Sequence, residues 1–371
     1  MLRLNVHLDP YKTGRDAESL RNGLNRLIIG QPTAIDAIVN QYSTLITGMC
    51  QPGRPIGNFL FLGPTGSGKT RTVEATAEVL MKDPRAVIKI DCAEFQHSHE
   101  IAKLIGSPPG YLGHRETHPL LSQEVLNQFH TDTIKLSFVL FDEIEKASDS
   151  LWNLLLGIMD KAKLTLGDNR KVDFSRAMIF MTSNLGADKM ISQYHVGFDR
   201  PTTPNANKLS SIGVGAARKK FTPEFFNRLD RVVVFEPLLE TGIRRILDLE
   251  LNLVQQRIFN TSPERSFVFT CTERAKDLVS TEGFDKLYGA RFLKRAIERL
   301  LVQPLSNLIA TEQVRGGDWI SIDIDDSGER LVFVKQSEGL SVPDMVLLVD
   351  TSITVPVPGG GNPQVARNSK R

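Results

Sequence analysis

Two kinds of hydrophobic pattern alternate along the first 237 residues. Apolar residues at helical spacing predict helices at 16–28 and 32–48. Short apolar runs bounded by turn residues predict five strands, at 59–62, 86–90, 138–141, 178–181 and 232–235. Such runs, apolar on both faces and separated by helices, are typical of strands buried in a parallel sheet. We therefore expect a doubly wound α/β domain with a five-stranded parallel sheet and helices on both faces.

The pattern changes after Pro237 to one that predicts a smaller, mostly helical domain with a short β element. Helices are predicted at 240–259, 272–281 and 289–313, and strands at 266–270, 319–324 and 331–335. From about Ser341 the periodicity fades, and a run rich in Pro and Gly precedes a basic end, which predicts a flexible tail. The predicted domains are thus 1–237 and 238–338, followed by a tail at 339–371.

Composition narrows the class of protein. The 371 residues favour two domains, and 45 basic against 43 acidic residues leave a net charge of +2, which argues against a nucleic-acid partner. Cys50, Cys92 and Cys271 are far apart and odd in number, as expected of free thiols in a reducing compartment. The first ten residues do not form a signal peptide, and no apolar run is long enough to span a membrane. We expect a soluble, cytoplasmic protein without a membrane partner.

A phosphate-binding loop follows the first predicted strand and precedes a helix. Its residues are Gly63, Pro64, Thr65, Gly66, Ser67, Gly68, Lys69 and Thr70. Glycines let backbone N–H groups turn toward phosphates, the Lys69 ammonium can neutralise the β and γ oxygens, and the Thr70 hydroxyl can ligate magnesium. The loop therefore predicts binding of ATP with Mg²⁺.

Two later strands end in polar residues that fit hydrolysis. Asp142 and Glu143 follow the strand at 138–141, where Asp142 can hold the magnesium shell and Glu143 can polarise an attacking water. Asn184 follows the strand at 178–181. Because the carboxyl ends of parallel strands form the ligand edge of an open sheet, Asn184 can face the γ-phosphate; its alternative role is to cap a turn beside Gly186. The sequence thus predicts an ATPase.

These motifs, in this order, resemble the Clp branch of the AAA+ ATPases, specifically the second ATPase module of ClpA-, ClpB- and ClpC-type unfoldases. Over roughly residues 20–335, the resemblance rests on the loop above and on five further segments: Gly106–Gly113, Phe141–Lys146, Thr182–Gly186, Phe221–Arg228 and Gly289–Arg291. It implies an ATP-dependent protein unfoldase that threads polypeptide through the pore of a homo-oligomeric ring, which we expect to be a hexamer.

The resemblance also assigns residue roles. Asn184 would be the first sensor, Arg291 the second sensor in the lid, and Arg228 the finger that reaches a neighbour's ATP. Ile28 and Ile29 would flank the adenine. The alternatives are a surface ion pair of Arg228 with an adjacent carboxylate, a solvated helix face for Arg291, and core packing for the two isoleucines.

The resemblance further implies two contacts with other proteins. Tyr111, in a loop rich in Gly and Pro, would line the pore and grip unfolded or tagged protein substrates. Val196, Gly197 and Phe198 resemble the tripeptide with which related unfoldases dock on a Clp-type peptidase; the alternatives are a loop packed on its own domain and a disaggregase without a peptidase. Two other function classes stay open, a nucleic-acid motor or loader and an ATP-sensing scaffold that is not a motor.

Overall fold

The computed structural model describes residue 9 and residues 12–107, 118–195, 206–261, 266–284 and 290–348. The chain divides into two compact units, each described by itself below. The first contains Met1–Gly242 and Asp285–Ala290, and the second contains Ile243–Phe284 and Arg291–Arg371.

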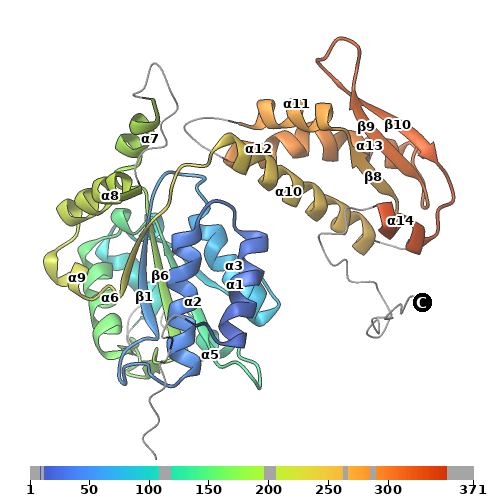
Figure 1. Cartoon of the computed structure of the whole chain (residues 1–371). Helices are drawn as coiled ribbons and strands as arrows, with labels where there is room; N and C mark the ends of the chain where they lie inside the picture. Colours follow the sequence, from blue (N-terminus) through green and yellow to red (C-terminus); the bar gives the residue numbers. More distant parts are fainter. Residues whose placement is uncertain are drawn as a thin grey trace, which may run out of the picture. The chain divides into compact units, whose positions relative to one another are not determined.

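A parallel sheet forms the centre of the first unit (Figure 1). Its strands occur in the order β2-β3-β6-β1-β7, and every neighbouring pair is parallel. The bounds are β1 (Gly57–Leu62), β2 (Ile88–Asp91), β3 (Ser137–Asp142), β6 (Ala177–Ser183) and β7 (Arg231–Val234). All five predicted strands are confirmed. The hairpin of β4 (Lys163–Thr165) and β5 (Lys171–Asp173) was not predicted, because strands of three residues leave little periodic signal.

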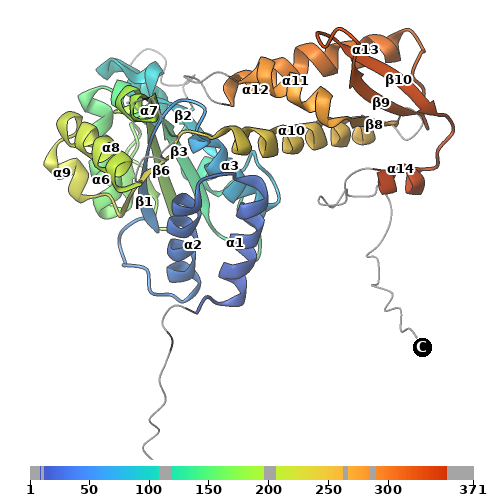
Figure 2. The same ribbon diagram turned by 45° about the horizontal axis from the view of Figure 1, so that its top comes forward.

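Helices cover both faces of this sheet because side chains along each strand alternate between the faces (Figures 1 and 2). Phe59 and Phe61 join the core beneath α1, α2 and α3, whereas Leu60 and Leu62 join the core on the side of α6, α8 and α9. The helices are α1 (Arg15–Leu27), α2 (Pro32–Ile46), α3 (Lys69–Met81), α4 (Ala102–Ile105), α5 (Gln123–Asn127), α6 (Asp149–Lys161), α7 (Ala187–His195), α8 (Ala206–Lys220) and α9 (Pro223–Asn227). The described residues of this unit also form the short 3-10 turns η1 (Cys92–Phe95), η2 (Ser98–Ile101) and η3 (Ile144–Lys146).

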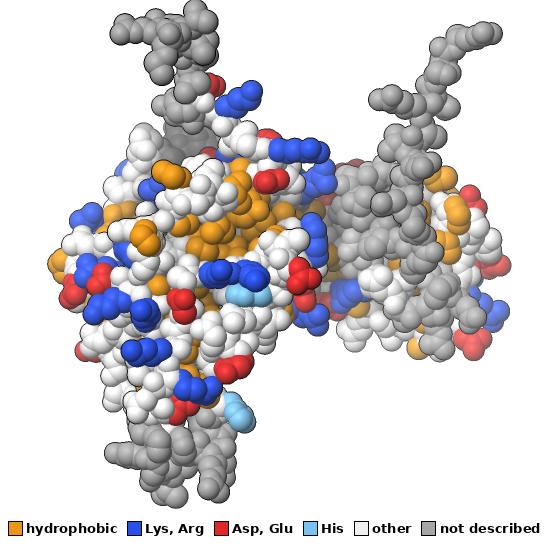
Figure 3. Space-filling view, turned by 90° about the horizontal axis from the view of Figure 1, so that it is seen from below, with side chains coloured by type: hydrophobic (Ala, Val, Ile, Leu, Met, Phe, Trp, Pro, Cys, Tyr) orange, Lys and Arg blue, Asp and Glu red, His pale blue; other side chains and the backbone are white. Residues whose placement is uncertain are grey.

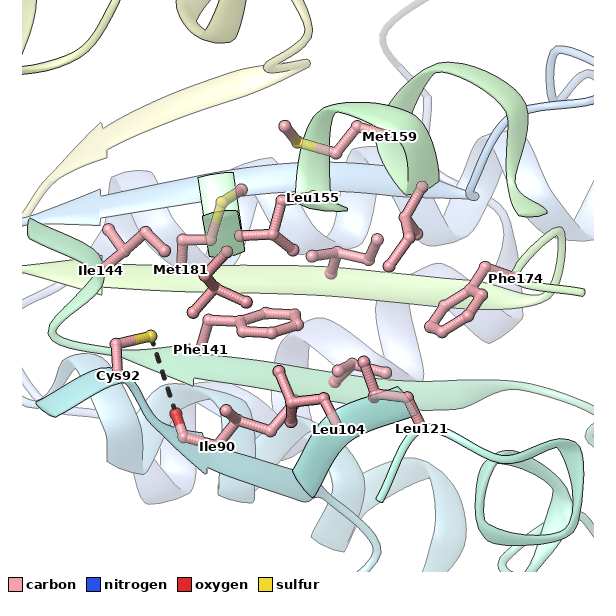
Figure 4. Close-up of a cluster of buried hydrophobic side chains, with 14 of the residues drawn as sticks. Ile90, Cys92, Leu104, Leu121, Phe141, Ile144, Leu155, Met159, Phe174 and Met181 are labelled. Carbon is pink, nitrogen blue, oxygen red and sulfur yellow. Dashed lines mark hydrogen bonds between the residues drawn. The ribbon is translucent and has the colours of Figure 1, made fainter. Parts of the chain in front are cut away.

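The core beside α6 packs four strands of the central sheet, β1, β2, β3 and β6, against their covering helices (Figure 4). Phe141 of β3 and Met181 of β6 are completely buried there with Leu155 of α6. Burying such side chains stabilises a fold by about 1.5–3 kcal/mol each relative to leaving them exposed. Because this packing continues to the carboxyl ends of β3 and β6, it fixes the polar residues that follow these strands.

The second unit combines helices with a three-stranded sheet of order β10-β9-β8. Its elements are α10 (Glu240–Thr261), β8 (Val268–Cys271), α11 (Glu273–Gly283), α12 (Arg291–Ile297), α13 (Gln303–Ala310), β9 (Trp319–Ile324), β10 (Leu331–Ser337) and α14 (Val342–Leu348). A π-helical turn, Glu298–Val302, interrupts the helix predicted at 289–313. It ends two residues before Pro304, which has no N–H to continue the α-helical ladder.

The prediction of a flexible tail over 339–371 is wrong for residues 342–348. Helix α14 lies there, and its Met345 is 1% exposed in a cluster with Phe259 and Val268. This helix has only two turns, so its apolar spacing is too short to stand out in the sequence. Residues 349–371 lie outside the described part of the chain. Within the described part, no helix is long and apolar enough to cross a membrane.

Candidate functional site

The phosphate-binding loop is shaped by close contacts at the carboxyl end of β1. A Cβ atom on Gly63 would lie 2.6 Å from the backbone oxygen of Phe235, the residue after β7. Any residue larger than glycine would therefore clash with the backbone there. Gly68 has φ +97°, a conformation that side chains disfavour, and α3 begins at the next residue. The first N–H groups of a helix have no intrahelical partner and attract anions. The predicted loop therefore has the backbone that phosphates require.

Lys69 is almost completely buried within this loop, with only 8% of its surface exposed. Its ammonium donates to the backbone oxygens of Gly63 at 2.7 Å and Pro64 at 2.8 Å, and to Asn184 Oδ1 at 2.9 Å. Burial lowers the pKa of Lys69 to about 8, although the carboxylates of Asp142, Glu145 and Glu143 act in the opposite direction. The cation is thus held at the strand edge and is sensitive to mildly alkaline pH.

Oxygen atoms suited to magnesium meet beside Lys69. The Thr70 hydroxyl lies 3.4 Å from Asp142 Oδ2, and the Thr182 hydroxyl donates to Asp142 Oδ1. Magnesium prefers oxygen ligands and is commonly held by one or two protein groups together with phosphate oxygens. The hydroxyl of Thr70 and the carboxylate of Asp142 therefore fit a magnesium ion bound with ATP.

Glu143 occupies a constrained position at the same edge. Its backbone has φ +56°, and its N–H donates to the Thr182 hydroxyl at 3.1 Å. Asn184 Nδ2 donates to Glu143 Oε1 at 3.3 Å, and Lys146 forms an ion pair with the other carboxylate oxygen. This contact with Glu143 raises the pKa of Lys146. A non-glycine residue in the left-handed region is uncommon and is often found at functional sites.

Asn184 joins the predicted residues into one network. Its side chain contacts both Lys69 and Glu143, while its backbone N–H donates to Glu145 Oε1 at 3.0 Å. Its backbone oxygen also accepts from Ala187 in the turn toward α7, so both roles considered for this residue have structural support. The structure thus brings Lys69, Glu143 and Asn184 together, and their catalytic roles stay predictions.

Several residues of this network were not predicted. Thr182, Glu145 and Lys146 were recognised only as parts of longer motifs, and their signal was their place beside the two strand ends. Gln31 was not recognised at all. It is 4% exposed, and its side chain contacts the backbone of both Ser67 and Glu236. Contacts between residues 205 positions apart leave no local sequence pattern.

Ile28 and Ile29 lie just before Gln31 and are 6% and 9% exposed. Ile28 belongs to the core cluster beneath α1 and α2, as the core-packing alternative requires. Their predicted contact with adenine stays a prediction.

Arg228 lies at the edge of the sheet opposite to the phosphate-binding loop. Its backbone oxygen accepts from Asn58 Nδ2 at 3.2 Å, and Asn58 is near the beginning of β1, whereas Gly63 follows its end. Five extended residues separate these two positions by about 16 Å. The guanidinium lies 3.1 Å from Asp160 Oδ1, without the alignment of a hydrogen bond, and 3.9 Å from Glu224 Oε1. The structure therefore does not bring Arg228 to the loop of its own chain.

The remaining predicted residues belong to the second unit or lie outside the described residues. Arg291 is exposed at the start of α12 in the second unit, so its role as a second sensor stays a prediction. Tyr111, Val196, Gly197 and Phe198 lie outside the described residues.

The two ends of the segment that carries Tyr111 are described and are held together. Leu120 N–H donates to the oxygen of Lys103, and Leu121 N–H donates to the oxygen of Leu104, at 3.2 and 3.1 Å. Gly167, in the turn of the β4–β5 hairpin, donates to the oxygen of Ile105 at 2.8 Å. The base of this segment is therefore anchored by α4 and by the hairpin.

Comparisons with known proteins match both units of the chain. The family described as "AAA domain (Cdc48 subfamily)" matches residues 54–232, and the "C-terminal, D2-small domain, of ClpB protein" matches residues 238–322. The chain belongs to the Clp family of AAA+ ATPases. The predicted resemblance to this family is confirmed, and so is the predicted enzyme class, an ATPase, at the level of the family.

Individual relatives of this Clp-family chain support the same assignment. It is 35% identical to the chaperone protein ClpB of Rhodopseudomonas palustris over 86% of this chain and 35% of the relative. It is 36% identical to ClpB of Bdellovibrio bacteriovorus over 85% of this chain and 34% of the relative, and 35% identical to the chloroplastic ClpC3 of Oryza sativa subsp. japonica over 88% and 34%. The chain thus spans about a third of the length of these relatives.

Solved structures of similar fold include two of Hsp104. One is a closed state with ATPγS and FITC-casein, with a TM-score of 0.71 over 88% of this chain and 53% of that chain. The other is an extended conformation of the Hsp104:casein complex from S. cerevisiae, with a TM-score of 0.74 over 87% and 53%. Both are 28% identical to this chain. They confirm the predicted fold class, a five-stranded parallel sheet followed by a smaller, mostly helical domain.

Proposed function

We propose that this Clp-family chain couples ATP hydrolysis to the unfolding or remodelling of other proteins, acting as a subunit of a ring. The observation that carries the proposal is the network at the carboxyl edge of the sheet, where Asn184 contacts both Lys69 and Glu143. A phosphate group bound at this edge could thus contact the Lys69 cation, the candidate base Glu143 and the Asn184 amide.

Nucleotide binding would use the loop from Gly63 to Thr70. The backbone N–H groups at the start of α3 and the Lys69 ammonium would bind the phosphates, while the Thr70 hydroxyl and the Asp142 carboxylate would hold magnesium. When bound, magnesium neutralises charge that develops on the phosphate oxygens. Ile28 and Ile29 would contact the adenine.

Glu143 would act as the base that polarises the attacking water. The Asn184 amide and the Lys146 ammonium hold the Glu143 carboxylate from two sides. An attacking water molecule would therefore contact a carboxylate oxygen whose orientation is fixed. Asn184, which accepts a hydrogen bond from Lys69, would be the first sensor of the γ-phosphate. Arg291, from the second unit, would be the second sensor.

Arg228 would complete the site of a neighbouring subunit. Because its own loop is about 16 Å away along β1, it can serve a nucleotide only on another chain. Its place between Asp160 and Glu224 keeps the guanidinium near the surface, 31% exposed. An arginine supplied in trans makes hydrolysis depend on assembly, which fits a homo-oligomeric ring, and we propose a hexamer.

Protein is the substrate that we propose. The relatives are named as ClpB chaperones, and the Hsp104 structures contain casein. Tyr111 would line the pore and grip an unfolded or tagged polypeptide, and the described residues on either side of its segment are held by α4 and the β4–β5 hairpin. An aromatic side chain can grip with little sequence preference.

Docking to a Clp-type peptidase through Val196, Gly197 and Phe198 is a separate part of the proposal. A disaggregase that works without a peptidase is the alternative, and the ClpB relatives are named as chaperones. The cytoplasmic location also stays a proposal, since the rice relative is named as chloroplastic.

Two other functions would need different surfaces or chemistry. On the face in Figure 3, Lys and Arg side chains lie among Asp and Glu side chains, unlike the continuous basic surface typical of a nucleic-acid motor. An ATP-sensing scaffold would not need a base at Glu143. Neither alternative explains the whole network as well as a motor does.

Magnesium-dependent ATP turnover would test the proposal. The chain is assayed alone, with an unfolded protein, and with single-stranded or duplex DNA at matched salt. Stimulation by unfolded protein is the expected result. Stimulation by DNA alone would support the nucleic-acid motor instead, and an absence of turnover under every condition would support the scaffold.

A further inference from the structure

Gln31 connects two segments that are distant in sequence and both border the phosphate-binding loop. It is the residue before α2, and its side chain is buried in the first unit. Its Nε2 donates to the Ser67 oxygen at 3.1 Å and to the Glu236 oxygen at 2.9 Å. Its Oε1 accepts from the Glu236 N–H at 3.2 Å. One amide therefore fixes both the loop and the chain directly after β7.

The contact with Ser67 determines how the next peptide group is turned. In a trans peptide the C=O of one residue and the N–H of the following residue point in opposite directions. Because Gln31 holds the Ser67 oxygen on its own side, the Gly68 N–H points to the other side of the loop. Gly68 has the φ angle that this turn needs, and its N–H is at the start of α3, where an anion would bind.

The contact with Glu236 ties this loop to the connection between the units. Phe235, the preceding residue, packs its backbone oxygen against Gly63 at the other end of the loop. Residues 235 and 236 thus border both ends of the loop, one directly and one through Gln31. Pro237 follows, and α10 leads from Glu240 into the second unit.

We propose that Gln31 is a positioning residue for nucleotide phosphates: it orients the Ser67–Gly68 peptide and ties it to the strand end that leads to the second unit. The inference rests on the proposed nucleotide function and extends it to a side chain that does not itself contact the nucleotide. Two of the three hydrogen bonds of Gln31 require an N–H donor facing a carbonyl oxygen. Replacing the amide nitrogen by an oxygen would turn both contacts into repulsions without changing the size of the side chain.

The test measures the dissociation constants of Mg²⁺-ATP and Mg²⁺-ADP for wild type, Gln31→Glu and Gln31→Met, well below each thermal midpoint. Gln31→Met removes the donors without burying a carboxylate, so it remains informative if Gln31→Glu fails to fold. A buried hydrogen bond left unmade costs about 1–3 kcal/mol, which corresponds to roughly a fivefold to 150-fold change in an equilibrium. We expect both variants to bind both nucleotides about tenfold more weakly.

Gln255→Glu is the matched control. Gln255 is 3% exposed in the second unit and also bridges a strand, donating to the oxygen of Phe267 at 2.8 Å and accepting from Phe269 N–H at 3.0 Å. Its substitution should lower the thermal midpoint and leave nucleotide affinity within about twofold of wild type, because its bonds lie outside the loop.

Turnover distinguishes positioning from a merely structural role. The Gly68 N–H would bind phosphate both before and during hydrolysis, so KM for ATP should rise about tenfold while kcat changes by less than about threefold. Folded Gln31 variants with wild-type affinity and KM would overturn the proposal. Failure of the wild-type chain to bind ATP would instead contradict the proposed function.

Discussion

The side chain of Asn184 lies between Lys69 and Glu143, accepting from the ammonium at 2.9 Å and donating to the carboxylate at 3.3 Å. Only one orientation of the amide satisfies both neighbours, because an ammonium can only donate and a carboxylate can only accept. A change at the phosphate beside Lys69 would therefore reach Glu143 through one side chain. This relationship links nucleotide binding to the candidate base.

Replacing Glu143 tests the base directly. Glu143→Gln keeps the size of the side chain and leaves an oxygen to accept from Asn184, but an amide is not a base. We expect nucleotide affinity to remain and turnover to fall about a hundredfold or more. Steady-state phosphate release and equilibrium nucleotide binding measure the two effects. Glu124→Gln, at an exposed carboxylate of α5, is the control, and undiminished turnover of Glu143→Gln would reject the assignment.

Nucleotide affinity should fall at mildly alkaline pH. Burial lowers the pKa of Lys69 to about 8, so the free site holds the ammonium below this pH and loses it above. Because phosphates bind the charged form, the affinity for ATP should fall by up to about tenfold per pH unit above 8. Binding measured from pH 7 to 9.5 checks the trend. Lys69→Met should bind weakly at every pH without this step, and a flat wild-type profile would contradict the account.

Arg228→Ala should abolish turnover without affecting the substituted chain's own phosphate-binding loop. The loss of an arginine supplied in trans is expected to cost about three to five decades in rate. Mixing Arg228→Ala with Glu143→Gln subunits should restore part of the turnover, since each contributes what the other lacks at a shared interface. Arg231→Ala, at an exposed residue of β7, is the control. Mixtures that stay inactive although the subunits exchange would contradict action in trans.

Tyr111→Ala should uncouple ATP hydrolysis from the processing of protein substrates. Because the proposed role of Tyr111 is to grip substrate and not to bind nucleotide, basal ATP turnover should persist while processing of an unfolded substrate falls. Tyr111→Phe retains the aromatic ring and should process substrate almost as wild type does. Equal processing by the alanine variant and wild type would remove Tyr111 from the proposed pore.

The sequence alone was sufficient to predict the site residues that belong to a recognisable local pattern. The strands that carry Leu62 and Asp142 are apolar on both faces, and the loop from Gly63 to Thr70 has fixed spacing, so their place at one sheet edge could be predicted. Asn184 could be placed there too, because it follows a strand of the same sheet.

Contacts that depend on long-range packing could not be predicted. Gln31 meets Glu236 only once β7 has paired beside β1, and Lys146 meets Glu143 through the turn η3. Helix α14 was missed because its position depends on a surface formed by Phe259 and Val268. In each case the local residues fit several structures, and the tertiary contact selects one.

The most direct measurement of the central claim follows the unfolding of a stably folded fluorescent protein that carries an unstructured tail. Wild-type chain with Mg²⁺-ATP is compared with the Glu143→Gln variant and with wild type given ADP. The account predicts ATP-dependent loss of fluorescence by wild type alone. Fluorescence that stays constant while wild type hydrolyses ATP normally would contradict the claim that this hydrolysis drives protein unfolding.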